Sequence, residues 1–137
     1  SVFSGQSMIL IPQQLAHFDV SDAVARMLDR PELWWQDVGL FVGHFEDWPS
    51  DWEAAIGDDV LERRRVHAIR SAAANVGATP LVLLAGQLES LLARRLAGEA
   101  VEIEPGLREQ LQQVFAATWQ TAAAAWQSSG GALAEAG

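Results

Sequence analysis

The apolar residues of this chain recur every three or four positions, and no segment shows the apolar–polar alternation of a β-strand. The clearest stripe is formed by Val66, Ile69, Ala73 and Val76. Steps of three, four and three residues place all four side chains on one face of a helix, which is the pattern of a helix packed into a bundle core. The spacing therefore predicts an all-α fold.

Glycine, proline and capping residues divide this pattern into separate helices. Pro31 suits the first turn of a helix because its missing N–H needs no partner there, and Gly77 suits a helix end because it adopts a positive φ without strain. The residues expected to cap helix N-termini are Ser21, Ser50 or Asp51, and Thr79, and Asp58 and Asp59 are expected to open a long helix with their negative charge at its N-terminus. The helices predicted from these signals span residues 21–29, 31–47, 50–56, 58–76, 79–98 and 106–127.

Four of the predicted helices are long, and the connections between them are short. Short connections force neighbouring helices to run antiparallel. We therefore predict an antiparallel up-down four-helix bundle with a short additional N-terminal helix. In this interpretation residues 1–17 form an N-terminal extension, residues 18–127 form the bundle, and residues 128–137 form a flexible tail rich in alanine and glycine.

Composition excludes several classes of function. Eighteen acidic residues against nine basic ones give a net charge of −9, which disfavours binding to nucleic acid or to an anionic membrane. The chain has no Cys, so a disulfide framework and a thiolate metal site are excluded. No apolar run approaches the ~18 residues of a membrane span. No pair of His residues has a metal-binding spacing, so neither a metal nor another cofactor is predicted.

The residue best suited to chemistry is His67, which lies on the flank of the predicted helix of residues 58–76 and points away from its apolar stripe. Its neighbours are Arg63, Arg64, Arg70 and Ser71 about one turn away, and Ala74 two turns along. A neutral imidazole nitrogen has the lone pair needed to attack phosphorus, and a nearby guanidinium can hydrogen-bond the phosphoryl oxygens. Small residues beside the ring leave room for the surface of a second protein.

Spacing alone also leaves open an ordinary structural role for His67 and for the arginines near it. A lone His on a charged helix face is most often a solvated side chain, and an arginine run such as residues 63–65 most often aids solubility and balances nearby acids. His17 and His44 lack the setting of His67 and are interpreted as structural or surface residues. The six tryptophans are expected to seal the ends of the bundle.

The segment His67-Ala-Ile-Arg70-Ser71-Ala-Ala-Ala-Asn-Val76-Gly77-Ala78, followed by Leu81 and by Leu88-Glu89, resembles the signature of histidine-containing phosphotransfer (HPt) domains. The resemblance covers about residues 18–127 and needs no gap between His67 and Glu89. Three positions depart from the usual pattern: Arg70 stands where the family usually has Lys, Ser71 where it has Gly, and Glu89 where many members have Gln. An acid at position 89 can bind the imidazole ring.

The resemblance implies a phosphorelay intermediate of two-component signalling. His67 would accept a phosphoryl group at ring Nε2 from a receiver-domain aspartyl phosphate and pass it to another receiver Asp. Arg70 would stabilise that group, and Ser71, Ala74 and Glu89 would belong to the partner-binding surface. The receiver would supply Mg²⁺ and most catalytic groups, so the chain would be a phosphocarrier rather than an enzyme. Receiver domains and a histidine or hybrid sensor kinase would be its partners, and the chain would be cytoplasmic.

The residues also support an expectation about docking and one about oligomeric state, and they leave two other functions open. From charge alone, Arg63 and Arg64 are expected to steer the acidic pocket of a receiver toward His67. A monomer is expected because the bundle needs no second chain to close its core. Two alternative functions stay open: a four-helix protein-interaction module without phosphotransfer, and a phosphotransfer domain within a chemotaxis-type kinase whose ATP-binding domain would lie elsewhere in the parent protein.

Overall fold

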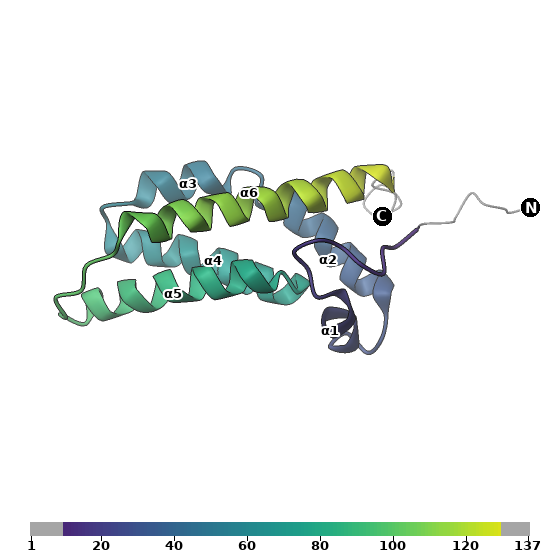
Figure 1. Cartoon of the computed structure of the whole chain (residues 1–137), viewed down its shortest axis with the longest axis horizontal. Coiled ribbons are helices and arrows are strands. Elements are labelled where there is room, and N and C mark those ends of the chain that lie inside the picture. Colours follow the sequence, from purple (N-terminus) through teal and green to yellow (C-terminus); the bar gives the residue numbers. More distant parts are fainter. Residues whose placement is uncertain (1–9, 130–137) are drawn as a thin grey trace, which may run out of the picture.

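The computed structural model describes residues 10–129, and Figure 1 shows that helices dominate this range. In chain order the helices are α1 (Val20–Ala25), α2 (Pro31–His44), α3 (Trp48–Ala55), α4 (Asp59–Val76), α5 (Thr79–Leu96) and α6 (Pro105–Ser128). No strand occurs in the described part of the chain, so the predicted all-α class is confirmed. None of these helices is both long and apolar enough to cross a lipid bilayer.

The helices form the predicted up-down four-helix bundle, but one of its four helix positions, the corner of the bundle next to α4 and α6, is occupied by two consecutive helices (Figure 1). Helices α2 and α3 share that corner and both pack against α4. Helix α4 also packs against α5, α5 against α6, and α6 back against α2, which closes the ring. The short helix α1 lies at one end, against α2 and α4. The predicted tail at residues 128–137 lies almost wholly outside the described residues.

The predicted N-terminal helix is correct in place but wrong at both ends. Asp19, not Ser21, caps α1, because its carboxylate accepts the backbone N–H of Asp22 at 3.2 Å. The helix ends at Ala25, short of the predicted residue 29. Asp29 has a φ of +57°, a left-handed conformation that a right-handed helix cannot contain.

Other predicted boundaries shift by a few residues. Helix α2 ends at His44, before the predicted residue 47, and α3 begins at Trp48. The expected caps Ser50 and Asp51 therefore lie inside α3 rather than in front of it. Thr79 is the first residue of α5 and not its cap. The longest connection is placed to within two residues, since α5 ends at residue 96 and α6 begins at residue 105.

The ends of α4 agree with the sequence prediction. Asp58 caps the helix by accepting the backbone N–H of Leu61 at 3.2 Å. Gly77 ends it with a φ of +81°, and its carbonyl accepts the backbone N–H of Asp19 at 2.8 Å. A Cβ on Gly77 would lie 2.8 Å from the Cβ of Ala23, so only glycine lets α1 approach this closely. This contact fixes α1 at the C-terminal end of α4.

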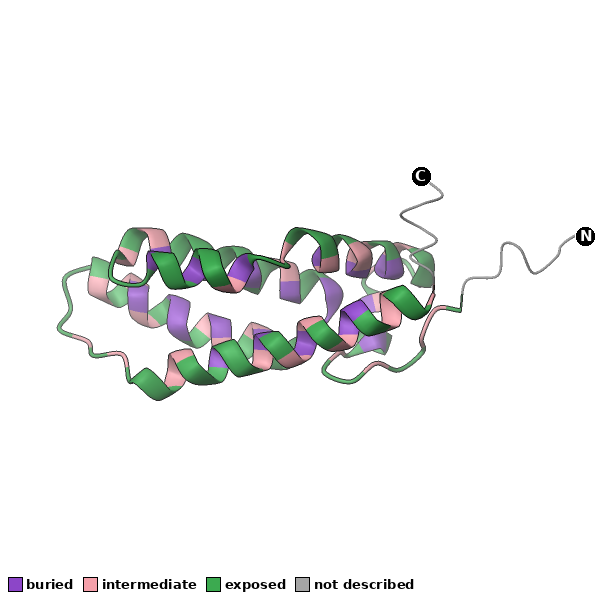
Figure 2. Cartoon of the chain, turned by 90° about the horizontal axis from the view of Figure 1, so that it is seen from above, coloured by how far each residue is buried: buried purple, intermediate pink, exposed green. Residues whose placement is uncertain are grey.

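The core lies along the bundle axis, where the buried faces of the helices meet (Figure 2). The predicted stripe on α4 is confirmed, since Val66, Ile69, Ala73 and Val76 are all buried. On α5 the stripe is shifted: the expected Leu84 and Leu91 are only half-buried, and the fully buried residues there are Leu81, Ala85, Leu88 and Leu92.

The tryptophans join helices across the core rather than only covering its ends. Trp34 is fully buried, and its indole Nε1 donates to the carbonyl of Val76 at 2.8 Å, which joins α2 to the end of α4. Trp48 of α3 donates in the same way to the carbonyl of Arg65 at 2.9 Å. Trp119 of α6 donates to the carbonyl of Val42 in α2 at 3.0 Å.

Gly39→Ala is expected to lower the free energy of unfolding by about 1–3 kcal/mol, because the ring of Trp126 in α6 packs directly against this residue. A Cβ on Gly39 would lie 2.5 Å from Cη2 of the Trp126 ring. Gly43→Ala, four residues along the same helix, is the matched control, since no atom lies within 4 Å of its Cβ position. Urea unfolding of the two variants should differ in this order, and equal stabilities would contradict the close packing.

Candidate functional site

His67 lies on the outward face of α4, as predicted. Its side chain is 58% exposed, whereas its neighbours Val66 and Ile69 are completely buried. The buried neighbours fix the rotation of the helix, so the imidazole is held at the surface by the packing of the core. The ring can therefore be reached by a second protein without any movement of the bundle.

Glu89 of α5 binds both the imidazole and the nearest guanidinium. Its Oε2 lies 2.7 Å from Nδ1 of His67, and its Oε1 lies 2.7 Å from Nη1 of Arg70. The Glu89 side chain is only 10% exposed, whereas that of Arg70 is 45% exposed. The carboxylate thus lies beneath the two other side chains and holds them next to each other.

This contact determines which ring nitrogen of His67 is free. An ionised carboxylate only accepts hydrogen bonds, so the hydrogen between Glu89 and the ring belongs to Nδ1. A neutral imidazole with its proton on Nδ1 has its lone pair on Nε2. Within residues 10–129 no side chain or backbone group hydrogen-bonds Nε2 of His67. The arrangement presents a nucleophilic nitrogen to an external group.

A groove runs along α4 and α5 beside His67. Its lining residues are Val60, Arg63, Arg64, His67, Glu89 and Leu96. Val60 is 49% exposed and Leu96 is 41% exposed, so the groove has apolar as well as cationic parts. These two residues were not among those predicted for the site. Val60 is two turns before His67 on the same face and could have been found from spacing, but Leu96 reaches the groove only through the packing of α5.

The arginine run of residues 63–65 differs from the other arginines of the chain. All six remaining arginines form an ion pair with Asp or Glu, whereas Arg63, Arg64 and Arg65 form none within the described range. This run was expected to balance nearby acids, but none of its three arginines forms an ion pair with an acidic residue in that range. A chain with a net charge of −9 thus presents a local cationic surface next to its exposed imidazole.

Ser71 and Ala74 continue the outward face of α4 beyond His67, and both are exposed. The carbonyl of Ala74 accepts a hydrogen bond from Nη2 of Arg26 at 3.1 Å, so α1 borders this face. The predicted site residues of α4 are therefore brought together on one surface. Glu89 also lines the groove, but its side chain is only 10% exposed because it lies beneath the imidazole ring.

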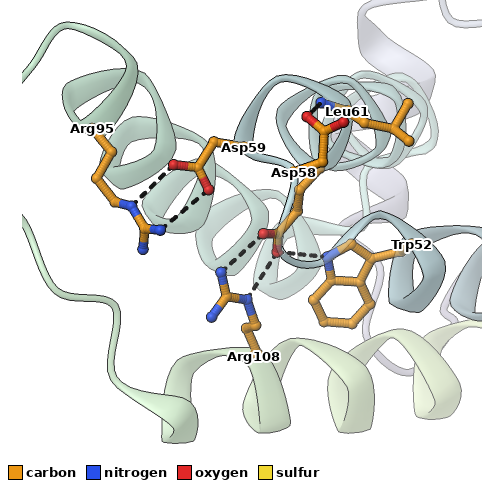
Figure 3. Close-up of polar contacts among 7 residues, drawn as sticks. Trp52, Asp58, Asp59, Leu61, Arg95 and Arg108 are labelled. Carbon is orange, nitrogen blue, oxygen red and sulfur yellow. Dashed lines mark hydrogen bonds and ion pairs between the residues drawn. The ribbon is translucent and has the colours of Figure 1, made fainter.

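A second polar cluster holds the N-terminal half of α4 in place (Figure 3). Glu62 is completely buried and accepts two hydrogen bonds from Arg108 of α6, both at 2.9 Å. Trp52 of α3 donates to the same carboxylate at 3.0 Å. The hydrogen bonds between Arg108 and Glu62 raise the pKa of Arg108 above its ordinary value. Asp59 and Arg95 form a more exposed pair that joins α4 to α5.

No group of three or more His, Asp or Glu side chains within residues 10–129 could hold a metal ion. The polar atoms around His67 are one carboxylate and several guanidinium groups, which suits an anionic group such as phosphoryl rather than a cation.

Comparison with known proteins supports the same class. The Hpt domain family model matches residues 52–120, which includes α4, α5 and most of α6. No curated protein and no solved structure matches the chain. Hpt domains are phosphocarriers that act in the phosphorelays of two-component signalling. Because the family model matches just over half of the 137 residues, this protein belongs to the Hpt domain family.

Proposed function

We propose that this chain is a phosphorelay intermediate in which His67 accepts a phosphoryl group from the aspartyl phosphate of a receiver domain and passes it to another receiver. The observation that carries the proposal is the contact of Nδ1 of His67 with Glu89, because on a side chain that is 58% exposed it leaves the lone pair on Nε2. The family match supports the reaction class, and the exposure of the His67 side chain together with its Nδ1 contact supports the choice of residue and atom.

The step needs no proton transfer at the imidazole. The lone pair on Nε2 of His67 attacks phosphorus, the P–O bond of the aspartyl phosphate breaks, and its electron pair returns to the aspartate carboxylate. The proton on Nδ1 stays in its hydrogen bond to Glu89 throughout. Phosphoryl transfer depends mainly on in-line placement and on neutralisation of charge, and the receiver supplies Mg²⁺ for this purpose. Arg70 supplies one further positive charge at the phosphoryl oxygens.

Docking of the receiver is proposed to use the groove and the small residues around His67. Ser71 and Ala74 allow close approach, and Arg63 and Arg64 attract the acidic pocket that surrounds a receiver aspartate. We further propose that residues 18–127 act as the functional unit, that the chain is a monomer, and that it works in the cytoplasm with receiver domains and a histidine or hybrid sensor kinase.

The proposal is tested by incubating the chain with a panel of isolated receiver domains that carry radioactive phosphate on their aspartate, in the presence of Mg²⁺. Label that moves to the chain and is labile in acid but stable in alkali identifies phosphohistidine. Absence of label with every receiver would reject phosphotransfer and would favour the alternative of a four-helix interaction module.

Arg63→Gln combined with Arg64→Gln is expected to slow phosphoryl transfer from a receiver roughly tenfold at low ionic strength, because the steering charges are lost. The difference should become small when salt shortens the screening length to a few ångströms. Arg30→Gln combined with Arg94→Gln removes the same charge from two exposed ion pairs outside the site and serves as the control. Equal transfer rates for the two double variants would contradict a steering role for the groove.

A further inference from the structure

Two of the three departures from the family pattern contact each other in this protein. Arg70 stands where Lys is usual and Glu89 where Gln is common, and Nη1 of Arg70 lies 2.7 Å from Oε1 of Glu89. A Lys–Gln pair would leave a full positive charge next to the imidazole. The Arg–Glu pair instead neutralises that charge in the resting protein.

The geometry indicates which of the two side chains can move. Glu89 is 10% exposed and is held by a second hydrogen bond to His67, so its carboxylate is fixed beneath the ring. Arg70 is 45% exposed, and its Cδ faces Gly86 of α5, which has no side chain. The guanidinium is therefore the mobile partner, and it is the group that a phosphoryl group on Nε2 would require.

We propose that Glu89 determines how firmly His67 holds a phosphoryl group, because its carboxylate competes with the phosphoryl oxygens for the guanidinium of Arg70. The inference rests on the proposed phosphotransfer function. The transfer replaces the P–O bond of an aspartyl phosphate with a P–N bond at Nε2, and the released electron pair goes to the aspartate. Because Arg70 must leave Glu89 or divide its donors to bind the new group, phosphorylated His67 is less stabilised than it would be beside an unpaired cation. The pair favours onward transfer over retention.

The test is the equilibrium of phosphoryl groups between this chain and a phosphorylated receiver domain with Mg²⁺. Glu89→Gln removes the competing charge, while the glutamine Oε1 can still accept the Nδ1 hydrogen of His67. The equilibrium constant for phosphorylation of His67 is expected to rise about fivefold, which corresponds to about 1 kcal/mol at 1.4 kcal/mol per factor of ten. Glu99→Gln removes the same charge from the ion pair with Arg94 outside the site and is expected to change nothing.

A second variant separates competition for Arg70 from an effect on the ring. In an Arg70→Gln background the competition no longer exists, so adding Glu89→Gln should change the equilibrium by less than about twofold. Nitrogen NMR of the imidazole should show the proton on Nδ1 of His67 in both the original chain and the Glu89→Gln variant.

The possible outcomes lead to distinct conclusions. An unchanged or lowered equilibrium in Glu89→Gln, with normal labelling of His67, would overturn this inference and leave phosphotransfer intact. A fivefold rise that persists in the Arg70→Gln background would also overturn it, because Glu89 would then act through the ring alone. Failure of His67 to accept phosphate from any receiver would overturn both the inference and the proposed function.

Discussion

Substitution of His67 by glutamine is expected to abolish phosphoryl transfer from a phosphorylated receiver to this protein completely. Glutamine has no nitrogen lone pair that can attack phosphorus, so no covalent phosphoryl intermediate can form. The fold should be unaffected, because the side chain is 58% exposed and the helix is held by its buried neighbours. Acid-labile label on the chain is the measurement, and circular dichroism checks that the variant is folded.

The chain offers two matched controls for this experiment. His17 and His44 are also exposed, but neither hydrogen-bonds a carboxylate within residues 10–129. His17→Gln and His44→Gln are therefore expected to take up label as the original chain does. Label that remains on the His67→Gln variant would show that the phosphoacceptor is a different residue.

Arg108→Ala is expected to lower the free energy of unfolding by about 3–5 kcal/mol, the largest effect on stability predicted here. The substitution leaves the carboxylate of Glu62 completely buried with only the Trp52 hydrogen bond, because both Arg108 donors at 2.9 Å are lost (Figure 3). A buried charge without its ionic partner is costly because the protein interior solvates it poorly. Urea unfolding followed by tryptophan fluorescence measures the loss.

Arg95→Ala is the control for this prediction, since it makes the same substitution in the second ion pair shown in Figure 3. Its partner Asp59 is 23% exposed and remains hydrated when the arginine is removed. A loss of about 1 kcal/mol or less is expected. Similar losses for the two variants would indicate that burial of Glu62 does not determine the contribution of its ion pair.

Much of the bundle follows from local signals in the sequence. The stripe from Val66 to Val76 and the turn at Gly77 place α4 correctly, because apolar spacing and positive φ are properties of a short segment. The boundary between α2 and α3 is less accurate, since it depends on the packing of Trp48 and its hydrogen bond to Arg65. Contacts between distant segments decide such boundaries, and spacing alone does not report them.

In the candidate site, too, contacts within one helix were predicted, whereas contacts between helices were not. Neighbours of His67 on α4, such as Arg63 and Ser71, were predicted because residues three and four apart share a helix face. The ion pair between Arg70 and Glu89 was not predicted, since it depends on how deeply α5 packs against α4. The role of Leu96 in the groove was missed for the same reason.

The hydrogen bond from Nδ1 of His67 to Glu89 has a consequence for the direction of signalling. In the proposed transfer the proton on Nδ1 stays in its hydrogen bond to Glu89, so neither half-reaction would consume or release a proton at this residue. A supply of protons would then favour neither the loading nor the unloading of this residue. The relative amounts of phosphorylated and unphosphorylated partners would then determine the direction of net phosphoryl transfer.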